Sequence, residues 1–404
     1  MALLRENQHR TSSLLTLGLL NFFIYGTTVI FAAFFQLYLQ DIGMNKLEIG
    51  ILLATGPLIS LLAHPFWRLM SDRSHNIRLI LLVMLIGLLA IGHLLFRVDT
   101  FQMLYLVIML VFFFQSPLLA QSNTMTLGYT TDTKQRYETY RLWGSLGWAT
   151  AALAAGIMID ATGKNGFSLL FSIMLVLAIG SALILPSSRF TADTPWIRGR
   201  EFRQVLKNKY FVIFIILGFF IAIPNSINAL FMPLFIRDLG GSRLSVGIAV
   251  FLSTLLEMVV FVLLDRYLKN RITYFVGSLT IVSILFALRW DLMADATHPI
   301  QIILIQLLHA ITFGGFFYIG NRLIAVLLPR SLRTAGQAVY SFTLSGVTGI
   351  IAGLLGGFTF QDFGPVIMYQ MGMLMTLFAA IGFGALWYHF HKNGYPTITS
   401  QQQP

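Results

Sequence analysis

The sequence predicts an all-α polytopic membrane protein in which twelve transmembrane helices form two six-helix pseudo-repeats. The first observation behind this prediction is composition, since 56% of the 404 residues are hydrophobic and only 11% are charged, with a mean hydropathy of +0.77. A soluble protein carries about 25% charged residues. The second observation is a series of long apolar runs, and the third is an internal repeat.

Each apolar run is long enough for a helix to cross a bilayer, which takes about 20 residues. The first run is far longer than the apolar core of a signal peptide and has no small-residue cleavage pattern, so we interpret it as a span. Short polar loops separate the runs, which lie at residues 13–39, 47–67, 78–97, 101–123, 140–160, 166–186, 210–236, 244–264, 272–290, 300–328, 335–360 and 364–388.

The distribution of Lys and Arg predicts the orientation of these spans. An even number of spans puts both termini on one side, and all but six of the 27 Lys and Arg residues belong to that side. Positive charge gathers on the cytoplasmic side of a membrane protein, so we expect both termini to be cytoplasmic. This asymmetry accounts for the net charge of +11 without a nucleic-acid partner. The six exceptions are Lys46, Arg97, Lys164, Arg237, Arg243 and Arg289.

An internal repeat divides the chain near its centre. Asp72-Arg73 follows the second predicted span, and Asp265-Arg266 follows the eighth, about half the chain length later. The longest polar segment, 187–209, lies between these two positions. We therefore predict an N-terminal six-helix bundle at 1–186, a cytoplasmic linker at 187–209 and a C-terminal bundle with a short cytoplasmic tail at 210–404. Such repeats are typical of transporters whose binding site lies between the halves.

Glu257 is the most informative side chain in the predicted spans. It lies well inside the eighth span with apolar neighbours on both sides, and no acid lies nearer the middle of any span. Charge inside a membrane is expensive, and an intramembrane acid is a functional candidate by default. We therefore expect Glu257 to take up and release a proton. The structural alternative is a buried Glu that pairs with an Arg or a Tyr.

Three further polar residues lie in or beside the spans. Arg289 is near the outer end of the ninth span, His309 is in the tenth, and Arg141 opens the fifth. Taken singly, His309 could be a satisfied core residue, and either Arg could extend to the membrane interface. Amides and hydroxyls in the spans could line a site or join helices; they are Asn21, Tyr25, Gln115, Gln121, Asn225, Asn228, Gln306 and Gln337.

Several of these segments together resemble one known family. The fifth-span segment from Arg141 to Trp148, the stretch from Glu257 to Phe261, and the pairs Arg289-Trp290 and Leu308-His309 are similar to the lactose permease, nucleoside permease and 3-phenylpropionate permease branch of the major facilitator superfamily. The segment 332–340 and the two Asp-Arg loops carry the same resemblance, although Arg68 and His75 stand where the loop motif usually has glycines.

The resemblance implies a role for each candidate residue. Glu257 and His309 would couple protons, and the Asp-Arg pairs Asp72, Arg73, Asp265 and Arg266 would gate the conformational change. Substrate would be bound by Arg141, Trp148, Asn123, Arg289, Tyr25 and Asn228. No catalytic residue, metal or cofactor is expected, because protons would serve as the coupling ion.

Two departures from the family pattern leave the substrate open. Thr312 stands where relatives carry a second carboxylate after the span-ten histidine, and Asn123 stands where they carry the acid that pairs with the span-five arginine. With Arg141 unpaired, an anionic substrate such as an aromatic or short organic acid is one possibility, because Arg binds carboxylates bidentately. The alternative is that Glu257 pairs with Arg289 or Arg141 and leaves a nearly neutral sugar or nucleoside site.

These features lead us to expect a secondary active transporter, a proton-coupled symporter of a sugar, nucleoside or organic acid that works by alternating access. The alternative on the same fold is a proton-driven exporter of drugs or lipids. An embedded enzyme would need a nucleophile, metal or acid pair in the membrane, and the predicted spans provide one acid away from their ends, Glu257, and no Cys. A sensor that binds without transport stays open. We expect a monomer in a bacterial inner membrane, with lipid and a small molecule as its partners.

Overall fold

The computed structural model describes residues 2–131, 137–185 and 199–395, and every secondary-structure element in that part of the chain is helical. The elements are α1 (Ala2–Asp41), α2 (Lys46–Ser74), α3 (Ile77–Leu95), α4 (Phe101–Gln115), α5 (Leu118–Thr131), α6 (Tyr137–Thr162), α7 (Lys164–Ile184), α8 (Gly199–Leu206), α9 (Lys209–Asp238), α10 (Arg243–Tyr267), α11 (Ile272–Ala294), α12 (Pro299–Ile305), α13 (Leu307–Leu327), the single turn η1 (Arg330–Leu332), α14 (Arg333–Ser341), the π-helical turn η2 (Phe342–Val347) and α15 (Thr348–Asn393).

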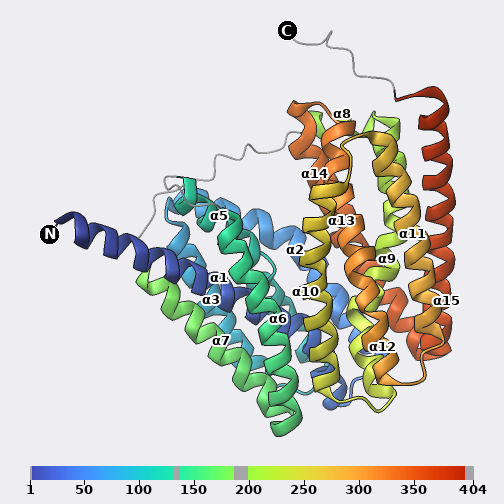
Figure 1. The fold of residues 1–404 in the computed structure, drawn as a ribbon. Helices are drawn as coiled ribbons and strands as arrows, with labels where there is room; N and C mark the ends of the chain where they lie inside the picture. The colour runs from blue at the N-terminus through green and yellow to red at the C-terminus, as the bar shows by residue number, and fades with distance from the viewer. Residues whose placement is uncertain (1, 132–136, 186–198, 396–404) are drawn as a thin grey trace.

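Helices account for all twelve predicted spans. Eleven stretches among the described residues are long and apolar enough to cross a membrane, and the last of them, Arg330–Asn393, contains the eleventh and twelfth predicted spans. These two spans meet at Gly364, where φ is 80° and the helical geometry of α15 is interrupted. A positive φ favours glycine, and the following Pro365 cannot continue a helix without a break. The chain reverses here (Figure 1).

Two predicted spans are not continuous helices. The fourth is divided at Ser116 and Pro117 between α4 and α5, and the tenth is divided at Gln306 between α12 and α13. Pro117 lacks the amide hydrogen that would continue the helix. The two interruptions therefore occupy the fourth span of each half. Ser116 and Gln306 keep helical φ and ψ, so each is a local distortion of the helix and not an unwound segment.

The helices form two bundles that lie side by side (Figure 1). We call α1–α7 the first half, in which α1 packs against α6 and α7, and α9–α15 the second half, in which α15 packs against α9 and α11. Most of the predicted linker, residues 187–198, lies outside the described residues, and its remainder includes α8.

The two halves meet at one end and separate at the other. Contacts between them are made chiefly by α2 with α15 and by α6 with α10. The halves converge away from the chain termini and diverge towards them, so the molecule has a V shape (Figure 1). We call the two ends the closed end and the terminal end.

Glycines allow the halves to touch through their backbones at the closed end. A Cβ atom added to Gly353 of α15 would lie 2.6 Å from the carbonyl oxygen of Gly50 in α2. A Cβ added to Gly247 of α10 would lie 2.6 Å from the carbonyl oxygen of Ala152 in α6. Both separations are shorter than van der Waals contact, so only glycine fits at these crossings. Small residues at helix interfaces permit such close packing in membranes.

A charged cluster adds to the closed-end contact between α6 and α10. The carboxylate of Asp160, at the end of α6, accepts hydrogen bonds from the backbone N–H groups of Arg243 at 2.9 Å and Leu244 at 2.8 Å. These amides belong to the first turn of α10, whose N–H groups have no partner within the helix. The guanidinium of Arg243 also pairs with Asp41 at the end of α1. The first half therefore completes the N-terminus of a second-half helix.

A second ionic contact joins the halves near the start of α2. Lys46 Nζ lies 2.9 Å from Asp238 Oδ1 at the end of α9, and Gln40 donates a hydrogen bond to the same oxygen at 3.3 Å. The start of α2 is fixed by a capping box, in which Asn45 accepts from the backbone N–H of Glu48 and Glu48 accepts from that of Asn45. The box thereby holds Lys46 in place.

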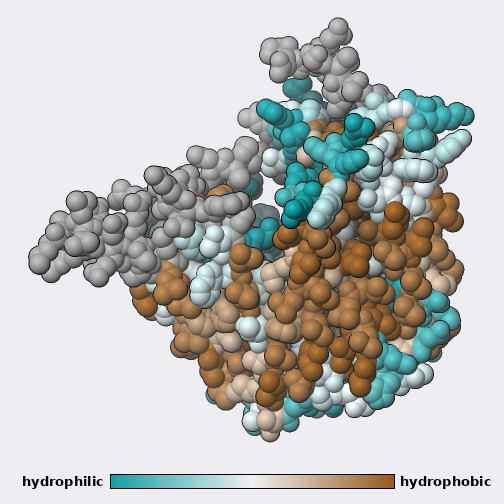
Figure 2. All heavy atoms as spheres, in the orientation of Figure 1, coloured by the Kyte–Doolittle hydropathy of each residue, from teal (hydrophilic) through white to brown (hydrophobic). Residues whose placement is uncertain are grey.

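The molecular surface matches a multi-pass integral membrane protein. Figure 2 shows hydrophobic side chains covering the middle of the visible face, with hydrophilic side chains gathered above and below them. Large apolar residues are exposed to the surroundings on both halves, such as Leu62, Ile184, Val262 and Ile381. Contiguous apolar surface of this extent marks an interaction surface, and here the span lengths identify lipid as the partner.

Candidate functional site

A cavity of about 370 Å³ lies between the two halves, and we call it the inner cavity. Helices α1 and α6 of the first half and α9, α10 and α13 of the second half contribute its walls. Ligand pockets typically enclose roughly 300–1,000 Å³. The polar and aromatic side chains that line the inner cavity are Tyr25, Ser145, Trp148, Asn225, Asn228, Ser253, Thr254, Glu257, Gln306, His309 and Phe313.

A larger cavity of about 1070 Å³, which we call the vestibule, adjoins the inner cavity. Ala32 and Ala229 line both spaces, so the two are contiguous. The vestibule is also lined by Phe202 of α8 and Ser341 of α14, and both helices lie at the terminal end (Figure 1). The inner cavity is therefore reached from the terminal end, and the closed end is sealed by contacts between the halves.

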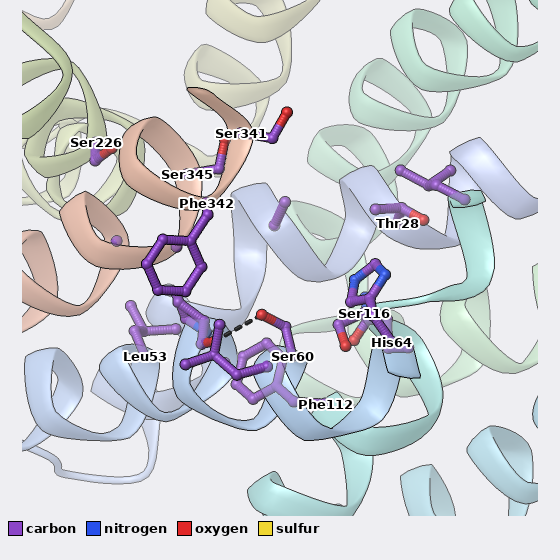
Figure 3. A pocket seen from close by; sticks show the side chains of 18 of the residues that line it. Thr28, Leu53, Ser60, His64, Phe112, Ser116, Ser226, Ser341, Phe342 and Ser345 are labelled. Atoms are coloured by element: carbon purple, nitrogen blue, oxygen red, sulfur yellow. Dashed lines mark hydrogen bonds between the residues drawn. The ribbon is translucent and has the colours of Figure 1, made fainter. Parts of the chain in front are cut away.

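The vestibule has an apolar lining with a few neutral polar groups. Figure 3 shows His64 and Ser116 together on the first-half wall, while Ser341, Phe342 and Ser345 extend from the second half. No Lys, Arg, Asp or Glu is among the described residues that line this space.

Glu257 lies on α10 and lines the inner cavity. Its Cγ atom packs against α13 at Gly314, where an added Cβ would lie 3.2 Å away, so the absence of a side chain there leaves room for the acid. Arg141 of α6 is close enough to act on the Glu257 carboxylate electrostatically. Among the described residues, however, no ion pair joins Glu257 to Arg141 or to Arg289.

His309 lies near the start of α13 and lines the inner cavity. Gln306 ends α12, and the break there starts α13 at Leu307. The imidazole of His309 stacks on the ring of Phe313, one turn later, with ring centroids 5.0 Å apart and an interplanar angle of 14°. Its Nδ1 atom is buried and has no hydrogen-bond partner in the described part of the chain.

Arg289 is placed differently from the sequence-based expectation that it shares a cavity with Glu257 and His309. Its side chain is fully buried within the second half and does not line the inner cavity. The guanidinium donates to Gln306 Oε1 at 2.6 Å and, more weakly, to Thr312 Oγ1 at 3.4 Å. Arg289 therefore binds Gln306 on the side away from the cavity, whereas Gln306 itself lines the cavity. The neutral Thr312 leaves it without a carboxylate partner at that position.

The first-half wall of the inner cavity is neutral. Tyr25 and Trp148 line it, and the Tyr25 hydroxyl donates to Asn123 Oδ1 at 3.2 Å. Asn123 is not among the lining residues, and its contact with the cavity wall is this hydrogen bond from Tyr25. Close approach of α1 to α6 is allowed by Gly144, where an added Cβ would lie 2.9 Å from the Tyr25 ring. Arg141 is exposed and outside the cavity lining as well.

On the second-half wall, α9 contributes two amides. Asn228 is buried and accepts a hydrogen bond from the Tyr369 hydroxyl at 3.1 Å. Asn225 also lines the cavity, and its Oδ1 atom is buried without a partner in the described residues. Despite Pro224 and Pro233, α9 runs unbroken from Lys209 to Asp238.

The second Asp-Arg pair of the repeat makes its contacts within the second half. Asp265, at the end of α10, accepts hydrogen bonds from Tyr318 at 2.8 Å and from Arg322 at 2.7 Å, both on α13. Arg266 instead lies over the ring of Tyr267, with its guanidinium carbon 5.6 Å from the centroid. Asp265 thus joins two helices of one half through Arg322 and not through its sequence neighbour.

The first Asp-Arg pair is less engaged. Asp72 lies 4.0 Å from Arg68, one turn earlier on α2, at the limit of an ion pair. Arg73 is in the last turn of the same helix. The gating role of both pairs stays a prediction.

Sequence reasoning missed several residues at the interface of the halves. Ser253 and Thr254 line the inner cavity one turn before Glu257 on the same helix face. Their spacing of four and three residues from Glu257 could have predicted this position. The closed-end cluster of Asp41, Asp160 and Arg243 was missed because its members lie far apart in the sequence. No group of metal-ligating residues is found in the described ranges.

Two helical bundles around a central cavity, open at one end inside an apolar belt, define a membrane transporter of small solutes. The sequence matches the MFS_1 like family over residues 14–371. The chain therefore belongs to this family, as the sequence resemblance predicted.

Individual relatives agree with this assignment. The chain is 24% identical to the maltose permease of Geobacillus stearothermophilus over 355 residues, covering 86% of this chain and 87% of that protein. It is 26% identical to the probable 3-phenylpropionic acid transporter of Escherichia coli (strain K12) over 368 residues, covering 87% and 92%. Because these relatives are transporters, the chain is classed as a transporter and not as an enzyme.

A solved structure confirms the fold. The crystal structure of the nucleoside transporter NupG superposes with a TM-score of 0.78 at 17% identity, covering 92% of this chain and 98% of that one. At this identity the likeness shows the major facilitator fold alone. The all-α, two-bundle prediction is confirmed.

Proposed function

We propose that this transporter is a proton-coupled symporter that moves its solute by alternating access. The observation that carries the proposal is the position of Glu257, a carboxylate in a cavity between two halves that forms no ion pair within the described part of the chain. Such a charge in an apolar span is unfavourable, and protonation or a bound ligand relieves it. Glu257 would therefore bind a proton and solute together from one side and release both on the other.

The shape of the molecule supports the alternating-access part of the proposal. The halves, taken as the six-helix units predicted from the repeat, would rock about the inner cavity. In the conformer described here the terminal end is open. The opposite conformer would part α2 from α15 and α6 from α10 at the closed end and would close the vestibule.

The expected location follows from the same family and charge pattern. We propose a bacterial inner membrane with both termini in the cytoplasm, because Lys and Arg gather on the side of the termini. The vestibule would then face the cytoplasm. His309 would support Glu257, since both line the same cavity.

One observation favours the rival proposal, a proton-driven exporter of lipophilic compounds. The vestibule is large, about 1070 Å³, and most of its lining side chains are apolar, including Phe31, Phe112, Phe202 and Phe342. An exporter would accept many hydrophobic ligands in such a space. A symporter would use the vestibule only as a passage to the selective inner cavity.

Proton movement in proteoliposomes tests the proposal. A pH-sensitive dye inside the vesicles would report protons while uridine, maltose or 3-phenylpropionate is added outside. We expect one of these solutes to drive protons inward with the wild type, and Glu257→Gln to reduce proton entry at least tenfold while solute exchange continues. Asp291→Asn is the matched control, because it removes an exposed carboxylate from neighbouring α11.

Two results would contradict the symport proposal. Accumulation of solute against its gradient by Glu257→Gln would show that this acid does not couple protons. Proton release on addition of a lipophilic cation, with no response to the polar solutes, would favour the exporter instead.

A further inference from the structure

The charges along the route through the protein point to the chemistry of the solute. In the inner cavity, the one lining side chain with a full charge is the acid Glu257, and the described lining of the vestibule has none. Neither space is lined by a Lys or an Arg among the residues that the structure describes. Among the described residues, the lining of the two cavities therefore offers a solute no cationic side chain.

Neither of the two arginines that could have bound a carboxylate lines the inner cavity. Arg289 is fully buried, and its guanidinium is engaged by Gln306 and Thr312. Gln306 stands in the cavity wall, whereas Arg289 does not. Arg141 acts on Glu257 electrostatically but is also absent from the lining. A carboxylate in the inner cavity would thus meet the carboxylate of Glu257 in the lining, whereas Arg141 would act on it only from outside the lining.

The energetic consequence is a strong preference against anions. Moving a charged group out of water without an opposite charge or sufficient hydrogen bonds is far less favourable than moving a neutral hydroxyl or amide. The cavity offers two kinds of acceptor: the carboxylate of Glu257 in its lining, and the buried Oδ1 of Asn225, which has no partner in the described residues. These atoms suit ligand groups that donate hydrogen bonds.

The remaining walls suit a flat or ring-shaped ligand. Trp148 and Tyr25 line the cavity from the first half, and the stacked pair of His309 and Phe313 lines it from the second. Aromatic faces bind other rings and the C–H faces of sugars through broad apolar contact.

We infer that the solute is an uncharged, ring-containing molecule rich in hydrogen-bond donors, such as a nucleoside or a sugar, and not a carboxylate. This inference rests on the proposed use of the inner cavity for transport. It also fits proton coupling, because a protonated Glu257 leaves the lining of both cavities without a formal charge. Solute and proton would then cross as a pair carrying one positive charge.

Binding to matched neutral and charged molecules tests the inference without any transport step. Purified protein in detergent would be titrated with glucose and glucuronate, and with 3-phenylpropionamide, 3-phenylpropionate and 3-phenylpropylamine. Uridine and maltose would distinguish a nucleoside from a sugar. Thermal unfolding and competition between ligands would report affinity. We expect each neutral member to bind at least tenfold more tightly than its carboxylate, and the neutral amide to bind more tightly than the amine.

A positive charge introduced into the cavity lining tests the same inference from the side of the protein. Ala229 lines both cavities and is exposed, so it accepts a longer side chain. Ala229→Lys should improve carboxylate binding relative to the neutral partner at least tenfold, whereas Ala229→Gln, of similar length and uncharged, should leave the order unchanged. Glu257→Gln should narrow the preference for neutral ligands without reversing it.

Equal or tighter binding of either carboxylate by the wild type would overturn the inference, and so would tighter binding of the amine. If the wild type prefers neutral ligands but no solute drives proton movement, the inference about the solute stands and the symport proposal fails. The two proposals can therefore fail separately.

Discussion

The eleventh predicted span, which includes η2 and the start of α15, packs tightly against α2 at one end and loosely towards the other. At the closed end, a Cβ on Gly353 of α15 would lie 2.6 Å from the backbone oxygen of Gly50 in α2. Towards the terminal end, a Cβ on Gly346 of η2 would meet no atom nearer than 3.9 Å, and Leu61 of α2 would be 4.0 Å away. The vestibule occupies the space between them.

This difference explains how the conformer that is open at the terminal end is stabilised relative to the opposite conformer. Backbone contact, an ion pair and a helix cap hold the closed end, and all of them join one half to the other. The ionic contacts formed by Asp265 and Asp72 near the terminal end stay within a half. The closed end therefore carries the interactions that must be lost when the protein changes conformation, and substitutions there should act directly on the conformational equilibrium.

The largest effect is expected from Gly353→Ala. The added methyl cannot fit against Gly50 without moving two backbones, and overpacking of this kind costs roughly 1–3 kcal/mol. The closed end should open, shifting the population of conformers about fivefold or more. The chain has no native Cys, so spin labels at Leu69→Cys in α2 and Thr334→Cys in α14 would report the width of the terminal end, which should narrow.

Gly346→Ala is the matched control for this prediction. The same methyl would make only ordinary van der Waals contacts there, at 3.9 and 4.0 Å, and we expect the distance distribution and the thermal stability to stay within error of the wild type. Equal effects of the two substitutions would contradict the proposed difference between the ends.

An intermediate effect is expected from Asp160→Ala. This change removes the acceptor for the backbone N–H groups of Arg243 and Leu244, and losing a helix cap costs about 0.5–2 kcal/mol. The same labels should show a smaller narrowing of the terminal end. Asp160→Asn keeps one acceptor oxygen and should fall between the wild type and Asp160→Ala; an effect of Asn as large as that of Ala would show that charge, and not the cap, matters.

The smallest effect is expected from Lys46→Gln. Its pair with Asp238 is partly exposed, with side-chain exposures of 16% and 36%. Pairs of this kind contribute about 0.2–1 kcal/mol and are screened by salt. The shift in the conformer population should be detectable in low salt and should vanish in molar salt. A shift that persists in high salt would mean that Lys46 acts through packing on α15.

Much of this architecture could be predicted from local sequence. All twelve apolar runs fall in helices, because span length and composition are properties of each segment alone. Glu257 was predicted well inside the eighth span, and it lies on α10 in the lining of the inner cavity, since its apolar neighbours can face lipid and helices while the acid cannot. The breaks at Pro117 and Gln306 were not foreseen, although a proline was visible at the first.

The positions of other residues depend on which helices pack together, and a single sequence does not show helix packing. Arg289 was expected in the cavity, but the packing of α11 against α13 places it behind Gln306. The contact of Asp160 with the first turn of α10 follows from the crossing of two helices from different halves. The roles of the candidate site residues in binding and proton transfer are still predictions.

The cap that Asp160 provides also controls when two backbone amides are exposed to water. When the two halves part at the closed end, the amide hydrogens of Arg243 and Leu244 lose their acceptor and become hydrated. Their exchange with deuterium would then occur only in molecules that are open at that end, as for any protected amide that exchanges through local opening. The exchange rate of these two amide hydrogens therefore measures how often the closed end opens.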